Sequence, residues 1–154
     1  MNQLSTRHVA RVVVVDASGS VLLCRYAETR EACVVSFWVP PGGALEPGEN
    51  HLSAAARELQ EETGLVIHPE HELWERRFTL HMRGGPVDQV ERYFLARLSS
   101  ERPAVMNHSS EDIQDLRWWS LPELRATDET IYPDGFVEQL TDILAGRLRN
   151  TIRI

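Results

Sequence analysis

The chain has 154 residues, of which 42% are hydrophobic and 25% charged, a composition typical of one soluble globular domain. Its net charge of −7 argues against a general nucleic-acid or anionic-membrane surface, but it does not exclude a small phosphorylated ligand. The two cysteines, Cys24 and Cys33, show no metal-ligand spacing, so neither a disulfide scaffold nor a zinc site is expected. We see no apolar signal region and no stretch near the ~18 apolar residues that span a bilayer, so a cytoplasmic location is expected.

The first part of the chain alternates strand signals with turn residues. The pattern predicts a buried strand at residues 8–15, a turn at 16–19 and a second strand at 21–25 that closes a hairpin. A polar loop at 26–34, a short strand at 37–39 and a glycine-rich bend at 40–43 are expected to follow. The bend reads Pro-Pro-Gly-Gly, and glycine lets the backbone approach a ligand closely.

An amphipathic helix is predicted next. Asn50 is a suitable N-cap, and Gly64 fits the left-handed residue that ends a helix. The i, i+3, i+4, i+7 pattern predicts one buried stripe, made of Leu52, Ala55, Ala56 and Leu59.

Three carboxylates share one face of this helix, since Glu58, Glu61 and Glu62 stand at i, i+3 and i+4. Like charges at this spacing repel by a few tenths of a kcal/mol per pair, and a divalent cation among them removes the repulsion. We expect this face to reach solvent beside the apolar stripe, with Arg57 paired to Glu61. Taken alone, the acids fit a solvated helix face as well as a metal site.

The remainder of the chain predicts more strands and two further helices. Strands are expected at residues 65–68, 73–80, 89–98 and 116–119, with a polar loop at 99–114. A short helix is expected after Ser120, and a longer one at 133–148 with a core stripe at Phe136, Val137, Leu140, Ile143 and Leu144. This mixture predicts an α/β fold with a sheet between helices.

The segment from Gly43 to Leu65 resembles the Nudix box in full. The box reads Gly, five residues, Glu, seven residues, Arg-Glu, an aliphatic residue, any residue, Glu-Glu, any residue, Gly and an aliphatic residue. Its fixed positions are matched by Gly43, Glu49, Arg57, Glu58, Leu59, Glu61, Glu62, Gly64 and Leu65. The resemblance implies a single Nudix hydrolase domain over residues 1–154, folded as an α/β/α sandwich with a mixed sheet between helices.

The same resemblance implies a metal-dependent site. Nudix enzymes use Mg²⁺ or Mn²⁺ to hydrolyse a nucleoside diphosphate linked to another group. The metal ligands are then expected to be Glu58, Glu62, Glu61 and the carbonyl of Gly43. Glu58 and Glu61 are expected to be catalytic, with Arg57 in the role of orienting a glutamate.

Three candidates and one weaker competitor lie outside the box. Glu111, in the polar loop, matches the place where many Nudix proteins carry an extra catalytic or metal-binding glutamate, and Glu91 is a weaker competitor for that role. Arg25 ends the second predicted strand, where a Nudix arginine often meets phosphate. Trp38 is a candidate substrate-binding residue, with a place in the core as its alternative.

The sequence therefore predicts a Mg²⁺-dependent, MutT-like pyrophosphohydrolase acting on a nucleoside triphosphate or a similar small nucleotide. Substrate-specific tags known elsewhere in the family are mostly missing. The alternative is a catalytically inactive Nudix module that binds or senses a nucleotide, but such modules usually have gaps in the acidic helix. No membrane or nucleic-acid partner is expected, and a homodimer stays open.

Overall fold

The computed structural model describes residues 3–99 and 113–147 and the backbone of residues 152–153. The helices are α1 (His51–Thr63), α2 (Leu121–Ala126) and α3 (Phe136–Leu144). The strands are β1 (Thr6–Val15), β2 (Val21–Arg30), β3 (Cys33–Val39), β4 (Gly42–Ala44), β5 (His71–Met82), β6 (Gly85–Arg97), β7 (Ile113–Trp119) and β8 (Ile152–Arg153). None of the described helices has the length and apolarity that would let it span a membrane.

The strands form one mixed sheet with the order β3-β2-β1-β6-β5-β8, to which β4 adds beside β1 and β7 beside β2. Its centre is the parallel pair β1–β6, in register from Thr6↔Asp88 to Val15↔Arg97. The hairpins β2–β3 and β5–β6 are antiparallel. The predicted mixed sheet between helices is thus confirmed.

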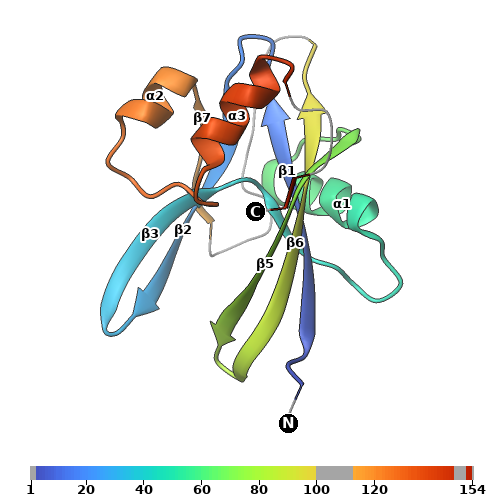
Figure 1. Cartoon of the computed structure of the whole chain (residues 1–154), viewed down its shortest axis with the longest axis vertical. Helices are drawn as coiled ribbons and strands as arrows, with labels where there is room; N and C mark the ends of the chain where they lie inside the picture. The colour runs from blue at the N-terminus through green and yellow to red at the C-terminus, as the bar shows by residue number, and fades with distance from the viewer. Residues whose placement is uncertain (1–2, 100–112, 148–151, 154) are drawn as a thin grey trace.

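Helices cover both faces of this sheet, with α1 on one side and α2 and α3 on the other (Figure 1). Successive β1 side chains point to opposite faces, so a single strand supplies both cores. One core joins Ala10, Val12 and Val14 to Ala54, Ala55 and Leu59 of α1. The other joins Val13 and Val15 to Phe136, Leu140 and Ile143 of α3. The sheet therefore fixes where α1 lies.

Strands β1 and β2 separate soon after they meet, and this opens the sheet. They pair only at Val15↔Val21, after which β4 takes the place beside β1, with Gly42 opposite Arg11. Strand β2 continues with β3 and β7 instead. As a result the β2–β3 and β5–β6 hairpins point the same way but stand apart, at the lower end of Figure 1.

Four details of the sequence prediction are wrong. Residues 26–34 form the outer part of the β2–β3 hairpin rather than a loop, because backbone pairing holds these polar residues in register from Tyr26↔Phe37 to Arg30↔Cys33. Residues 65–68 form no strand, since β5 starts only at His71. Helix α3 is shorter than the predicted 133–148, although its core stripe is packed as expected.

The fourth correction concerns the buried face of α1. Leu52, expected in the apolar stripe, is exposed, and the buried residues are Ala54, Ala55, Leu59, Glu62 and Thr63. A helical repeat is compatible with both the predicted stripe and the observed one, and contact with β1 determines that the observed stripe is buried. One of the three acids is therefore on the buried side of the helix, although all were expected to reach solvent.

Candidate active site

Helix α1 presents its acids at fixed positions because both of its ends are capped. The Asn50 side chain accepts the backbone N–H of Ser53 at 2.8 Å. Gly64 has φ of 79°, in the left-handed region, and its N–H donates to the carbonyl of Gln60 at 2.9 Å. Both predicted ends of the helix are confirmed.

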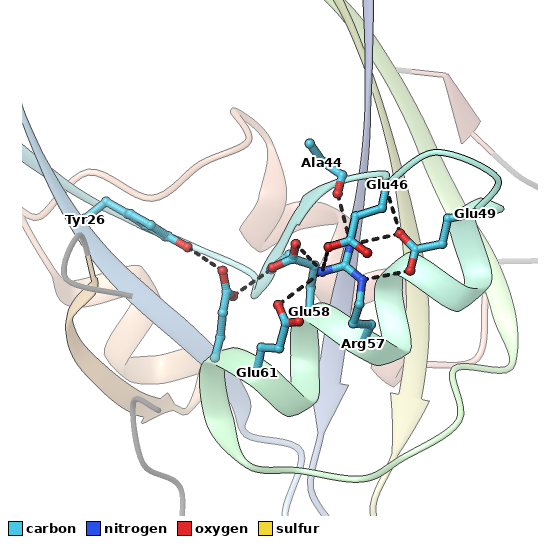
Figure 2. A network of polar contacts seen from close by, with 9 residues as sticks. Tyr26, Ala44, Glu46, Glu49, Arg57, Glu58 and Glu61 are labelled. Atoms are coloured by element: carbon cyan, nitrogen blue, oxygen red, sulfur yellow. Dashed lines mark hydrogen bonds and ion pairs between the residues drawn. The ribbon is translucent and has the colours of Figure 1, made fainter. Parts of the chain in front are cut away.

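Arg57 lies at the centre of a network of carboxylates (Figure 2). It donates two parallel hydrogen bonds to Glu49, from Nε to Oε2 at 2.7 Å and from Nη2 to Oε1 at 2.8 Å. Its Nη1 donates to Glu58 at 2.9 Å and to Glu61 at 3.1 Å, and Nη2 donates to the carbonyl of Ala44 at 3.1 Å. Hydrogen bonds from Arg57 and from a backbone N–H lower the pKa of Glu49 to about 2. The predicted Arg57–Glu61 pair is confirmed, within a larger cluster.

Glu58 lies against the glycine bend. A Cβ placed on Gly43 would stand 2.6 Å from Cδ of Glu58 and 2.7 and 2.8 Å from its two oxygens, so a side chain at residue 43 would collide with this carboxylate. Burial raises the pKa of Glu58, and the charges of Glu61 and Glu49 add to this, while Arg57 opposes it. The glycine bend and helix α1 are therefore in contact at the carboxylate of Glu58.

Glu62 is the buried acid of the three, with 6% of the residue exposed. Its Oε1 accepts the hydroxyl of Tyr26 at 3.0 Å and its Oε2 accepts the backbone N–H of Gly42 at 3.0 Å. Burial raises its pKa to about 7, although the Gly42 N–H and the positive charge of Arg11 act in the opposite direction. The bend thus contacts two of the predicted ligands, through Gly42 and Gly43.

The residues at the bend suit a hard divalent cation in type and charge. Glu49, Glu58 and Glu61 each pair with Arg57, and Glu62 adds a fourth carboxylate at the bend. Mg²⁺ prefers such oxygen ligands. In the part of the chain that the structure describes, no three His, Cys, Asp or Glu side chains already converge closely enough to hold an ion. In this structure Glu58 contacts Arg57, and Glu62 contacts Tyr26 and Gly42. The predicted role of these side chains as ligands stays a prediction.

A cleft of about 460 Å³ lies between the two separated hairpins. We call it the hairpin cleft. It is lined by Arg7 and Arg11 of β1, Glu28 and Arg30 of β2, Phe37 and Val39 of β3, Arg76, Phe78 and Leu80 of β5, Gln89 and Glu91 of β6, and Tyr132 and Asp134. Aromatic and aliphatic side chains thus share its lining with four arginines and three acids, a combination suited to a ligand with both an apolar ring and polar groups.

A buried acid, Glu91, organises the charged part of the cleft. It is 3% exposed and accepts the amide of Gln89 at 2.7 Å and the hydroxyl of Tyr93. Arg11 and Arg76 approach it to 3.5 and 3.8 Å. Burial favours the neutral acid, but these four partners outweigh burial and lower the pKa of Glu91. Glu91 therefore stays ionised and holds two arginines at the cleft.

Arg11 connects the hairpin cleft to the acidic helix. Its Nη1 donates to the carbonyl of Pro40 at 3.1 Å, two residues before Gly42. Its positive charge also lowers the pKa of Glu62, so the two groups interact electrostatically. One end of the cleft is therefore next to the bend and to α1.

Two of the candidates outside the box, Trp38 and Arg25, do not lie where the predicted ligand contacts would place them. Trp38 is 3% exposed and packs edge-on against Trp119 with ring centres 5.2 Å apart, so its alternative place in the core is confirmed. Arg25 precedes Tyr26 on β2, and adjacent strand residues point to opposite faces. Since Tyr26 reaches Glu62, the structure does not place Arg25 beside the acidic helix. Glu111 lies outside the described residues.

Two residues of the site, Arg11 and Tyr26, are not among the residues predicted from the sequence. Arg11 gave a usable signal, because it is one charge within an otherwise apolar strand, Val-Ala-Arg-Val-Val-Val-Val. A charge in such a strand costs free energy unless it is paired, so a partner was to be expected. Tyr26 gave no signal, because it sits in a segment assigned to a loop and meets α1 only through the tertiary fold.

Comparisons with known proteins point to one family. The NUDIX domain family model matches residues 5–140. Phosphatase NudJ of Escherichia coli K12 is 32% identical over 117 residues, which cover 76% of this chain and 71% of NudJ. NudJ of Shigella flexneri has the same identity and coverage.

Solved structures with the same fold include a MutT protein and a Nudix hydrolase. The MutT protein of Methanosarcina mazei Go1 superposes with a TM-score of 0.71 at 19% identity, covering 97% of this chain and all of its own. A NUDIX hydrolase of Nitrosomonas europaea gives 0.69 at 24% identity, covering 94% of this chain and 92% of its own. With the full sequence motif, the family match and this fold in agreement, the chain belongs to the Nudix family of hydrolases.

Proposed function

We propose that this Nudix hydrolase cleaves a phosphoanhydride bond in a nucleoside triphosphate or a similar small nucleotide, with Mg²⁺ or Mn²⁺ as cofactor. The observation that carries the proposal is the meeting of Glu58 and Glu62 with the Gly42–Gly43 bend at the end of the hairpin cleft. A diphosphate needs positive charge and an oriented water, and these acids suit the cation that supplies both.

The proposed ligands are Glu58, Glu61, Glu62 and the carbonyl of Gly43. When bound, a divalent cation would supply positive charge to the diphosphate oxygens and to the attacking water. Arg57 orients Glu58 and Glu61 through its Nη1. The proton of the attacking water passes to one of these two carboxylates, which are the proposed catalytic residues.

The hairpin cleft is the proposed place of the remaining part of the substrate. Phe37, Phe78 and Tyr132 offer rings against which a base can pack. Arg11 lies between this cleft and the bend, so it is the best-placed described arginine for a phosphate oxygen. The structure favours Arg11 over Arg25 for this role.

Three further observations support a catalytic small-molecule enzyme. The E. coli relative is named a phosphatase, which agrees with hydrolysis at phosphorus. The net charge of −7 disfavours a long nucleic acid, since phosphate contacts along a strand need a basic surface. A sensor module has no need for a full set of acids around Arg57, and the full set is present here.

A substrate screen tests this proposal directly. Nucleoside triphosphates, dinucleoside polyphosphates and nucleotide sugars are incubated with the protein and Mg²⁺, and released phosphate and pyrophosphate are measured. We expect turnover of at least one small nucleotide, loss of turnover with a chelator, and recovery when Mg²⁺ is restored. The Glu62→Gln variant, purified in parallel, controls for contaminating phosphatases.

Three results would contradict the proposal. Full activity in the presence of chelator would exclude the metal-dependent mechanism. Binding of nucleotides without turnover, under either Mg²⁺ or Mn²⁺, would favour a sensor module. Faster turnover of capped or 5′-triphosphorylated RNA than of any free nucleotide would overturn the choice of a small substrate.

A further inference from the structure

Glu62 is held from two sides, and one of its partners comes from a distant strand. Among the described residues, its Oε2 accepts the backbone N–H of Gly42 and its Oε1 accepts the hydroxyl of Tyr26, each at 3.0 Å. One contact to a carboxylate still allows rotation about it, whereas one contact to each oxygen fixes the carboxylate plane. Tyr26 therefore supplies the second of two restraints.

The Tyr26 ring is itself fixed by aromatic packing. Tyr26 stands opposite Phe37 in the β2–β3 pair, and the two rings stack with centres 6.0 Å apart and planes 20° apart. Phe37 in turn meets Tyr132 edge-on, with ring centres 5.2 Å apart. This packing holds the phenol before any ligand binds, so orienting Glu62 costs little side-chain entropy.

The chemical nature of this partner distinguishes it from Arg57. Arg57 carries a positive charge and offsets part of the charge of Glu58 and Glu61. A phenol donates a hydrogen bond without neutralising the carboxylate. A phenol ordinarily has a pKa of about 10, so it is protonated at neutral pH. Glu62 is thus oriented by a neutral group, which adds no positive charge that would compete with a cation.

We propose that Tyr26 is a positioning residue whose hydroxyl holds the Glu62 carboxylate at the glycine bend, in the orientation that binds the divalent cation. This inference rests on the proposed metal-dependent function. Residues that hydrogen-bond to metal ligands set the geometry of those ligands, and their loss typically weakens metal binding by 10–100-fold. Tyr26 contacts a ligand rather than the substrate, so its effect should be visible without turnover.

The test compares two conservative variants, Tyr26→Phe and Tyr93→Phe. Each removes one tyrosine hydroxyl that donates to a carboxylate, but the partner of Tyr93 is Glu91, which is not among the proposed ligands. Mn²⁺ binding is measured without nucleotide, by electron paramagnetic resonance of free Mn²⁺, alongside thermal unfolding in chelator. We expect Tyr26→Phe to raise the dissociation constant about tenfold and Tyr93→Phe to stay within about twofold of the wild type.

The activity of the same variants gives a second readout. Tyr26→Phe should need about tenfold more Mg²⁺ for half-maximal rate, whereas kcat at saturating Mg²⁺ should recover to within about threefold of the wild type. A purely structural role would lower kcat at every Mg²⁺ concentration.

Each contrary result is informative. Unchanged Mn²⁺ affinity in Tyr26→Phe would overturn the inference while leaving the hydrolase proposal intact. Tighter Mn²⁺ binding would also overturn the inference, because Tyr26 would then compete with the cation. Equal weakening in both variants, or loss of cooperative unfolding in Tyr26→Phe, would assign the hydroxyl a structural role. A wild-type protein that binds no Mn²⁺ would overturn the proposed function together with this inference.

Discussion

Gly43 and the carboxylate of Glu58 are in such close contact that no side chain fits between them. A Cβ on Gly43 would stand 2.6 Å from Cδ of Glu58, shorter than any ordinary contact of this kind. The obstacle is the end of a flexible side chain, so it can move aside. We therefore expect Gly43→Ala to fold but to displace Glu58, lowering kcat by about tenfold or more at saturating substrate. Steady-state kinetics and the melting temperature separate the two effects.

A substitution at the adjacent residue, Gly42, should instead lower the stability of the protein. A Cβ on Gly42 would stand 2.2 Å from the carbonyl oxygen of Ala10, which belongs to the central strand and cannot move aside. We expect Gly42→Ala to lower the free energy of unfolding by about 1–3 kcal/mol or more. Urea denaturation measures this, and Gly84→Ala, where an added Cβ meets nothing within 4 Å, is the matched control. A Gly42→Ala protein as stable as the control would contradict the contact.

Replacing a proposed ligand should lower the activity while the protein stays folded. Glu58→Gln and Glu62→Gln should each lower kcat by about 10³-fold, the loss of several kcal/mol of charge stabilisation. Both variants should remain folded in chelator, because the amide keeps the size of the side chain and removes repulsion among the acids. Unfolding of either variant would favour a structural role for that glutamate.

The buried carboxylate of Glu62 predicts a specific pH dependence of stability. Its folded-state pKa of about 7 lies above the ordinary value of 4.5. Between pH 4.5 and 7 the folded protein therefore keeps a proton that the unfolded chain has released. The free energy of unfolding should fall across this window, by roughly 2–4 kcal/mol from this group.

Urea denaturation in chelator at several pH values measures this slope. Glu62→Gln has no proton to lose at this position, so its slope should be shallower and its relative stability highest above pH 7. Equal slopes in the two proteins would show that Glu62 does not titrate in this window.

Lysine substitutions at Arg11 and at Arg25 test which of the two arginines contacts a phosphate. Arg11→Lys keeps a charge beside Glu91 but loses the planar guanidinium that reaches both Glu91 and the carbonyl of Pro40. We expect kcat/KM to fall about tenfold or more in Arg11→Lys and less than about threefold in Arg25→Lys. The reverse order would restore the original expectation for Arg25.

Glu111 remains a candidate from the resemblance alone. If it acts in the site, Glu111→Gln should lower kcat by more than about threefold without changing stability. Glu91→Gln is a useful comparison, because it should also disturb Arg11 and Arg76 and lower the melting temperature. A Glu111→Gln enzyme with wild-type kinetics would remove Glu111 from the catalytic set.

The sequence by itself determined the local features of the acidic helix. The cap at Asn50, the left-handed end at Gly64 and the Arg57–Glu61 pair each depend on residues within one or two helical turns. The same holds for the short helix after Ser120, where Glu123 completes a capping box. Such features follow from spacing along the chain.

Only the tertiary structure decided which side of α1 is buried and what surrounds each carboxylate. A 3.6-residue repeat allows neighbouring stripes, and packing on β1 selected the one that buries Glu62 and exposes Leu52. The partners of Glu62 come from Tyr26 and Gly42, 36 and 20 residues away along the chain. The ionised Glu91 and its arginines likewise depend on strand pairing. Burial and long-range hydrogen bonds set the protonation and orientation of an acid, and local sequence contains neither.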